Sequence, residues 1–203
     1  MNHNLTEIVF ILDRSQSMSG LENDTIGGFN GFVKEQAQLG QTNLTTVLFD
    51  DRYEILHDGI DAKDAVLTNK TYFTRGWTAL LDAVGKTIKD VGKRLEKTPE
   101  SLRPGKVIFV ITTDGEENSS RKYTYDKVKQ MITHQTEQYG WEFIFLGANI
   151  DVVKEGSSLG IDADQTFAFE ASSRGLTRMY AIAGAACKNM RVTKPQDKKA
   201  AGV

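Results

Sequence analysis

The sequence predicts a doubly wound, Rossmann-like α/β fold, in which a mostly parallel six-stranded sheet has one antiparallel edge strand and helices on both faces. Residues 8–12 and 107–111 are apolar runs without a polar break, as expected for strands buried on both faces. Between and after these runs, shorter strand-like segments alternate with segments in which apolar residues recur at helical spacing. Alternation of strands and helices is typical of parallel sheets with helical crossovers.

The first helix and a hairpin follow the first buried run. Residues 24–38 carry apolar side chains at helical spacing, and a glycine follows that can end the helix. Two strand-like runs at 44–49 and 53–56 are separated by a short acidic turn at 50–51, which favours a hairpin. The second strand would then be the antiparallel edge. Residues 57–59, His-Asp-Gly, are expected to turn the chain out of it.

The second half repeats the pattern after an irregular segment, residues 60–76, that shows no clean period. A helix is expected to begin at Thr78 and run to residue 95, because apolar residues lie on one face over that stretch. The second buried strand is expected over residues 106–113. The remaining elements are expected at 125–138 (helix), 143–146 (strand), 152–159 (helix), 166–169 (strand) and 174–190 (helix).

Length and composition favour one domain. A chain of 203 residues is long enough for one sizeable core and short for two, so we expect a single domain over residues 1–190. Residues 191–203 are polar, with Pro195 and three lysines, and are expected to form a disordered tail. The only cysteine, Cys187, lies in an alanine-rich helix segment, where we expect it to pack as a small apolar residue.

Charge and hydropathy exclude several classes of partner. The formal net charge is -2 and the pI is near 6.0, so neither nucleic acid nor a membrane surface is expected as a partner. The N-terminal residues lack the pattern of a signal peptide, and no apolar run approaches the roughly 18 residues of a membrane span. A cytoplasmic location is therefore expected.

Oxygen-bearing side chains follow the first buried run directly. Asp13, Ser15 and Ser17 offer one carboxylate and two hydroxyls at alternate positions of a turn rich in small residues. In open α/β sheets, sites form outside the carboxyl ends of the strands, and oxygen ligands suit hard cations. Asp and Ser are also common in helix caps and Asx turns, so this run alone leaves both interpretations open.

Two further oxygen side chains are expected at the same edge of the sheet. Thr78 lies at the start of a predicted helix, and Asp114 follows the second buried strand. Because doubly wound connectivity brings these loops to one edge, five oxygen side chains from three loops would converge there. Convergence of that kind indicates a cation site.

These positions resemble the motifs of the von Willebrand factor type A domain family, in particular its short single-domain members in bacteria and phages. In that family a DxSxS motif closes the first strand, a Thr comes from a Gly-x-Thr loop, and an Asp follows the fourth strand in a Thr-Asp-Gly motif. Here these motifs occupy residues 13–17, 76–78 and 113–115. The resemblance implies a metal-ion-dependent adhesion site whose metal-site residues are Asp13, Ser15, Ser17, Thr78 and Asp114.

The resemblance also implies a function. The three hydroxyls would bind Mg²⁺, or Mn²⁺ or Ca²⁺, directly, while Asp13 and Asp114 would bind through waters or fix them. Mg²⁺ requires near-octahedral coordination, so an Asp or Glu of a protein partner would complete the shell. The chain is therefore expected to be a metal-dependent protein-binding module and not an enzyme. Neither the partner nor the oligomeric state follows from the sequence.

Two departures from the family pattern lie at the expected partner-binding rim. Gln16 and Trp77 stand where glycines are usual, and Glu116 follows the Thr-Asp-Gly motif. Trp77 either contacts a partner or closes as a lid over the helix, and the sequence leaves both open. Neighbouring acidic residues, among them Asp50 and Glu117, are expected to be solvated loop charges.

Two other functions remain as alternatives. In a Mg²⁺-dependent phosphatase or hydrolase, Asp13 would be the nucleophile and Asp114 would hold the metal, but a second acid is expected two residues after the nucleophile, where Ser15 stands. In the other alternative the metal site is purely structural, and its removal would unfold the chain.

Overall fold

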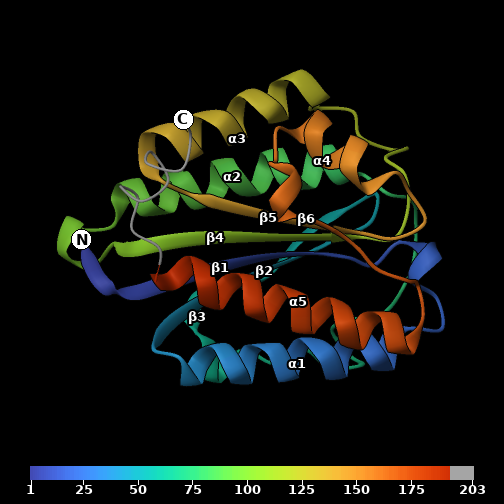
Figure 1. Cartoon of the computed structure of the whole chain (residues 1–203), viewed down its shortest axis with the longest axis horizontal. Coiled ribbons are helices and arrows are strands. Elements are labelled where there is room, and N and C mark those ends of the chain that lie inside the picture. The colour runs from blue at the N-terminus through green and yellow to red at the C-terminus, as the bar shows by residue number, and fades with distance from the viewer. Residues whose placement is uncertain (193–203) are drawn as a thin grey trace.

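The computed structural model describes residues 1–192, in which a six-stranded sheet lies between two layers of helices (Figure 1). The strand order is β3-β2-β1-β4-β5-β6, and of these strands β3 alone runs antiparallel to its neighbour. The strands are β1 (Asn2–Asp13), β2 (Gln41–Phe49), β3 (Tyr53–Asp61), β4 (Pro104–Thr113), β5 (Glu142–Gly147) and β6 (Thr166–Ala168). The predicted fold class, including the antiparallel edge strand, is confirmed.

The helices divide between the two faces of the sheet. In Figure 1, α1 and α5 lie below it, and α2, α3 and α4 lie above it. The helices are α1 (Glu22–Gln38), α2 (Leu80–Lys97), α3 (Tyr125–Tyr139), α4 (Val152–Leu159) and α5 (Ser173–Val192). Gly140 and Gly160, in left-handed backbone conformations with φ of 65° and 80°, end α3 and α4.

Alternate residues of the central strands point into two separate apolar cores. Phe10 of β1 faces α1, where its ring centroid lies 5.4 Å from that of Phe29. Phe109 of β4 faces the opposite layer and stacks on Trp141 at 5.2 Å. Burying one such side chain contributes about 2 to 3 kcal/mol, so the unbroken apolar runs hold both helical layers to the sheet.

Two expected boundaries differ from the structure. The turn expected at residues 57–59 is wrong, because β3 continues to Asp61. The turn-like residues are accommodated inside the strand, where the pairing of β2 with β3 shifts in register and Gly59 has a φ of 65°. The helix expected from Thr78 begins at Leu80. The Thr78 amide donates instead to the Asn118 side chain at 3.0 Å.

The C-terminal helix ends later than expected. Arg191 and Val192 continue α5, whereas the rest of the expected tail, residues 193–203, lies outside the described residues. Cys187 of this helix is a free and fully buried cysteine, as expected for a small apolar packing residue. None of the helices in residues 1–192 has both the length and the hydropathy that crossing a membrane requires.

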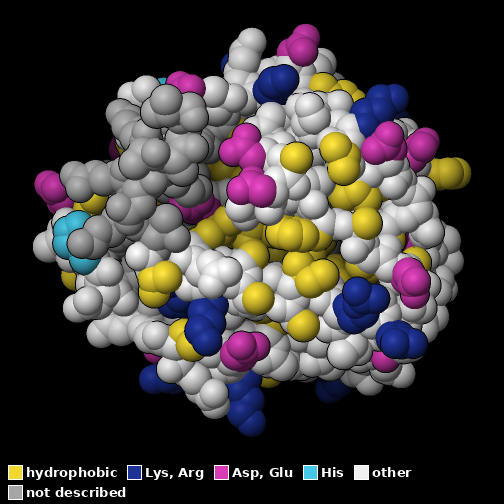
Figure 2. Space-filling model, in the orientation of Figure 1, with side chains coloured by type: hydrophobic (Ala, Val, Ile, Leu, Met, Phe, Trp, Pro, Cys, Tyr) yellow, Lys and Arg dark blue, Asp and Glu magenta, His cyan; other side chains and the backbone are white. Residues whose placement is uncertain are grey.

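The short strand β6 leaves part of one sheet edge at the surface. Figure 2 shows hydrophobic side chains gathered over this region, between α5 and the opposite layer. Phe167 and Phe169, in and just after β6, are partly buried against the α1–α5 core. The parallel strands end on the right in Figure 1, away from the N-terminus, and the candidate site lies at that edge.

Candidate metal centre

The DxSxS loop meets the loop after β4 at the carboxyl edge of the sheet. β1 and β4 are parallel neighbours, and Leu12 pairs with Thr112 one residue before each strand ends. The Ser17 hydroxyl donates to Oδ1 of Asp114 at 2.5 Å, and the Ser15 and Ser17 hydroxyl oxygens lie 2.9 Å apart. Side chains distant in sequence are therefore in direct contact.

Thr78 reaches the same place from the loop before α2. Its backbone N–H donates to the side-chain Oδ1 of Asn118 at 3.0 Å, and the backbone N–H of Asn118 donates to the Thr78 carbonyl at 3.1 Å. A Cβ atom added to Gly115 would lie 3.6 Å from the Thr78 hydroxyl oxygen and 3.5 Å from that of Ser17. Both hydroxyls therefore border one small space, which the glycine leaves free of a side chain.

Asp13 is buried and held by neutral donors. Its side chain is 1% exposed; Oδ1 accepts the Ser15 amide and Oδ2 accepts the Thr113 hydroxyl, each at 2.7 Å. Burial raises the pKa of Asp13 to about 6, although these hydrogen bonds act in the opposite direction. With both oxygens engaged, Asp13 is suited to orienting neighbouring ligands.

Asp114 has a buried oxygen without a partner. Oδ1 accepts the Ser17 hydroxyl, whereas Oδ2 is buried and accepts no hydrogen bond from the residues described. Burial raises the pKa of this carboxyl group. A buried carboxylate is stable only when hydrogen bonds or a cation compensate its charge, and no described Lys, Arg or His forms an ion pair with Asp114.

The donor set fits a hard divalent cation. Hydroxyl and carboxylate oxygens are the ligands that Mg²⁺, Mn²⁺ and Ca²⁺ accept, and the orphaned oxygen belongs to the carboxylate that accepts the Ser17 hydroxyl. Within residues 1–192 there is no group of three or more His, Cys, Asp and Glu side chains able to hold a metal. Three of the five predicted residues, Ser15, Ser17 and Thr78, offer hydroxyls, and their binding of a cation stays a prediction.

The expected rim residues lie at the surface. Gln16 and Glu116 are exposed, and the Trp77 side chain is 70% exposed. An indole exposed to this extent does not act as a buried lid over the helix. Whether Trp77 contacts a partner stays a prediction.

The expectation of solvated loop charges is wrong for two acidic residues. Asp50 is fully buried, and its Oδ2 accepts Nε of Arg14 at 3.0 Å and Nε of Arg75 at 2.7 Å. Glu117 accepts the Leu81 amide at 2.9 Å in the first turn of α2. Both carboxylates hold loops around the site, which explains why neither is simply solvated.

Sequence reasoning missed three supporting residues. The Tyr72 hydroxyl donates to the Asp13 carbonyl at 2.8 Å, Asn118 fixes Thr78, and Arg14 joins the first loop to Asp50. Asn118 closely follows the Thr-Asp-Gly motif, so its side chain could have been predicted to support the site. Tyr72 lies in a segment without periodicity, and no pattern marks it.

Comparisons with known proteins show the fold. No family model and no curated protein sequence matches the chain. The chain is similar over 94% of its length to proximal thread matrix protein 1 of the mussel byssus, with a TM-score of 0.63 and 14% identity. It spans 47% of that protein, another structure of which has a zinc-occupied MIDAS motif, the abbreviation of metal-ion-dependent adhesion site.

Two further solved structures are similar in fold to this chain. Manganese-loaded TRAP protein of Plasmodium vivax matches over 88% of this chain and 73% of its own, with a TM-score of 0.62 and 17% identity. A von Willebrand factor type A protein from Catenulispora acidiphila matches over 89% of this chain and 42% of its own, with a TM-score of 0.55 and 14% identity. The chain has the α/β fold of von Willebrand factor type A domains, as the sequence motifs implied.

Proposed function

We propose that this chain is a metal-dependent protein-binding module. Ser15, Ser17 and Thr78 would hold a divalent cation, Mg²⁺ in the first instance, with Asp13 and Asp114 fixing its surroundings. The bound cation supplies a Lewis-acidic position at which a carboxylate of a partner protein can bind. The observation that carries the proposal is the unpartnered, buried Oδ2 of Asp114, a carboxylate whose other oxygen accepts the Ser17 hydroxyl.

The residues of this chain have distinct tasks in that function. The hydrogen bond between Ser17 and Asp114 joins the two motif loops, and Asn118 holds Thr78 in the loop before α2. Asp13 receives its two hydrogen bonds from within the fold and keeps the Ser15 turn in place. The site is therefore preorganised before a cation or a partner arrives.

The test is thermal unfolding of metal-stripped protein titrated with Mg²⁺, Mn²⁺ and Ca²⁺. A cation that binds the native state alone adds about 2.7 kcal/mol at a hundred times its Kd. We expect the melting temperature to rise in the wild type and not in Thr78→Ala. Capture of a partner should then require the cation and fail with chelator. An unchanged melting temperature with all three cations would contradict the proposal.

The hydrolase alternative is disfavoured by the surroundings of Asp13. A nucleophilic carboxylate must reach its substrate, but this one is 1% exposed and both its oxygens accept hydrogen bonds. Phosphoester turnover that disappears in Asp13→Asn would favour the hydrolase. The structural-metal alternative predicts that metal-stripped protein is unfolded, which the same melting experiment detects.

A further inference from the structure

A groove of about 990 Å³ lies beside the candidate metal centre. It begins at Trp77 and Ala79, the neighbours of Thr78, and follows α2 as far as Lys93. Tyr53 of β3 and Tyr123 also line it. None of the five candidate metal-site residues lines the groove, but its lining includes the residues on either side of Thr78.

The groove is positively charged. Six of its lining side chains are basic and three are acidic, and two of the acids are engaged within the fold. Asp82 accepts the backbone amides of residues 121–123 at 2.8 to 3.0 Å, and Asp90 pairs with Lys86 at 2.5 Å. Within residues 1–192, no acidic side chain forms an ion pair with Lys89 or Lys93.

The lysines form a stripe along one side of α2. Lys86, Lys89 and Lys93 are separated by three and then four residues, so they share one helix face. At 1.5 Å per residue, the path from Leu80 to Lys93 is about 20 Å long. An extended peptide, at about 3.3 Å per residue, covers that length with about six residues.

Aromatic rings give the groove apolar contact area next to its charges. Trp77 is 70% exposed at the end nearest Thr78, and the ammonium group of Lys86 lies 4.0 Å from the centre of the Tyr53 ring. Tryptophan is enriched among the residues that contribute most to binding at protein interfaces. The groove therefore combines an anchor, a charge stripe and a neighbouring metal centre.

We propose that this groove binds an extended, acidic segment of the partner protein, whose first carboxylate reaches the cation. The inference rests on the proposed function, because the metal centre defines where the segment begins. Single-stranded nucleic acid also fits a basic groove with aromatic rings. The peptide is favoured because the metal centre beside the groove offers a position for a carboxylate.

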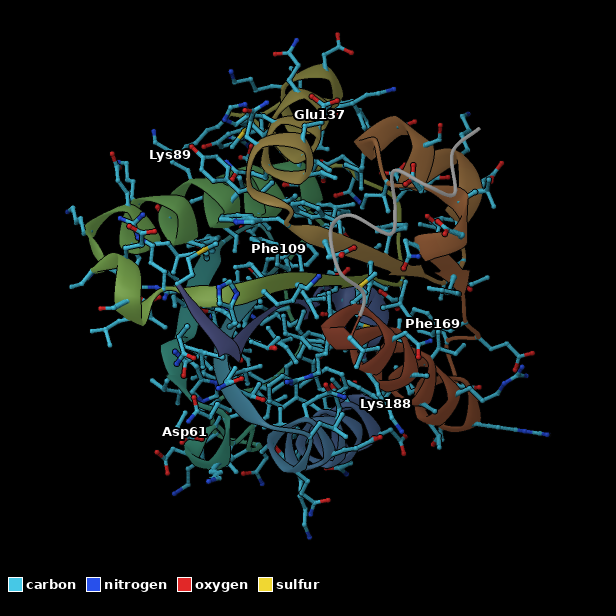
Figure 3. All side chains as sticks on the ribbon, turned by 60° about the vertical axis from the view of Figure 1, so that its left-hand side comes forward. Asp61, Lys89, Phe109, Glu137, Phe169 and Lys188 are labelled. Atoms are coloured by element: carbon cyan, nitrogen blue, oxygen red, sulfur yellow. The ribbon has the colours of Figure 1, made fainter. Side chains whose placement is uncertain are left out.

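The test uses the full chain with Mg²⁺ and a fluorescein-labelled oligoglutamate of about six residues. Its binding is measured by fluorescence anisotropy at low and high salt. The groove variant is Lys89→Glu/Lys93→Glu. The control, Lys34→Glu/Lys188→Glu, makes the same charge change at exposed positions of α1 and α5. Lys89 and Lys188 lie on opposite sides of the sheet (Figure 3).

We expect the groove variant to bind the peptide about tenfold more weakly at low salt, because two attractive pairs become repulsive. The control should stay within about twofold of the wild type, and high salt should reduce the difference. Chelator, or Thr78→Ala, should weaken binding as well. None of the four lysines is buried, so unfolding curves should show both double variants folded.

Three outcomes would overturn the inference and can be told apart. If the groove variant binds like the control while chelator releases the peptide, the groove does not bind the acidic segment, and the proposed function stands. If chelator and Thr78→Ala have no effect, the link to the cation is wrong, and the proposed function fails with it. If a labelled oligothymidylate binds more tightly than the peptide and loses binding in the groove variant, the occupant is nucleic acid.

Discussion

Two buried carboxylates on β1 are compensated in different ways. Glu7 is fully buried, and it accepts the Thr45 hydroxyl at 2.8 Å and the guanidinium of Arg94. Asp13, equally buried, accepts hydrogen bonds from neutral donors, and none of the described ion pairs includes it. The fold thus provides a cationic side chain for one carboxylate and not for the other.

The difference does not come from a lack of arginine near Asp13. Arg14 is the next residue, yet its side chain points to Asp50 and Glu54, at 3.0 and 2.8 Å. Its Nη1 is buried without a hydrogen-bond partner among the described residues. Arg14 is therefore held next to Asp13 but pairs with other carboxylates.

The largest predicted effect comes from removing the internal cation of Glu7. Arg94→Met leaves a buried carboxylate without its charged partner, and we expect a loss of about 3 kcal/mol in unfolding free energy. Urea denaturation measures the loss. Lys97→Met, at an exposed position near the end of the same helix, serves as the control and should change the value by less than about 0.5 kcal/mol.

A double variant separates lost charge compensation from lost packing. In Glu7→Gln/Arg94→Met, both charges are absent, so most of the stability lost in Arg94→Met should return. A double variant no more stable than Arg94→Met would mean that Arg94 acts mainly through the packing of its side-chain carbons.

The second prediction concerns the space between the hydroxyl groups of the candidate metal centre. Gly115→Ala places a methyl group in ordinary contact distance of the Ser17 and Thr78 hydroxyls, so it narrows the space they border. We expect the cation to bind at least about tenfold more weakly, a change of about 1.4 kcal/mol. Melting curves at increasing Mg²⁺ measure the affinity, and without metal the stability should stay within about 0.5 kcal/mol.

Gly27→Ala is the matched control for that substitution. Gly27 lies inside α1, and an added Cβ meets no atom within 4 Å. Alanine there should raise stability by about 0.5 to 1 kcal/mol through helix propensity and leave the response to Mg²⁺ unchanged. Equal responses to Mg²⁺ in both glycine variants would argue against a cation beside Gly115.

The third prediction compares the two carboxylates directly. Without metal, Asp13→Asn removes a buried charge that has no cationic partner, so we expect a gain of about 1 kcal/mol in unfolding free energy. The Thr113 hydroxyl can rotate so that it accepts a hydrogen bond from the side-chain NH₂ group of the new asparagine. Glu7→Gln should have the opposite effect, because Arg94 then loses its buried charged partner and keeps only the more exposed Asp58. Loss of stability in both variants would show that Asp13 needs no further cation.

Local patterns in the sequence predict the sheet and the five converging residues well. The unbroken apolar runs identify β1 and β4, and side chains at the carboxyl ends of parallel neighbours must lie close together. Asp13, Ser17 and Asp114 could therefore be placed from the sequence alone. Their surroundings were less accessible, because the partners of Asp50 and the Asn118–Thr78 hydrogen bonds join loops that lack periodicity.

The direction of the arginine side chains is the second feature that could not be predicted from the sequence. Arg14 and Arg94 are chemically alike, and nothing local distinguishes the one that compensates Glu7 from the one that pairs with Asp50. That choice depends on tertiary neighbours, here Glu54 of β3 and the position of α2 beside β1. The difference between the two buried carboxylates therefore emerges only once the strands and helices are packed.

The smallest predicted effect on stability is that of Trp77→Ala. Trp77 is 70% exposed, so removal of its indole should change the unfolding free energy by less than about 0.5 kcal/mol. The metal-induced rise in melting temperature should also persist, because the Thr78 amide is held by Asn118 and not by the indole. Thermal melts with and without Mg²⁺ test both statements. A reduced response to Mg²⁺ would mean that Trp77 helps to hold the Thr78 loop, and the rim and the metal-binding oxygens would then be one unit.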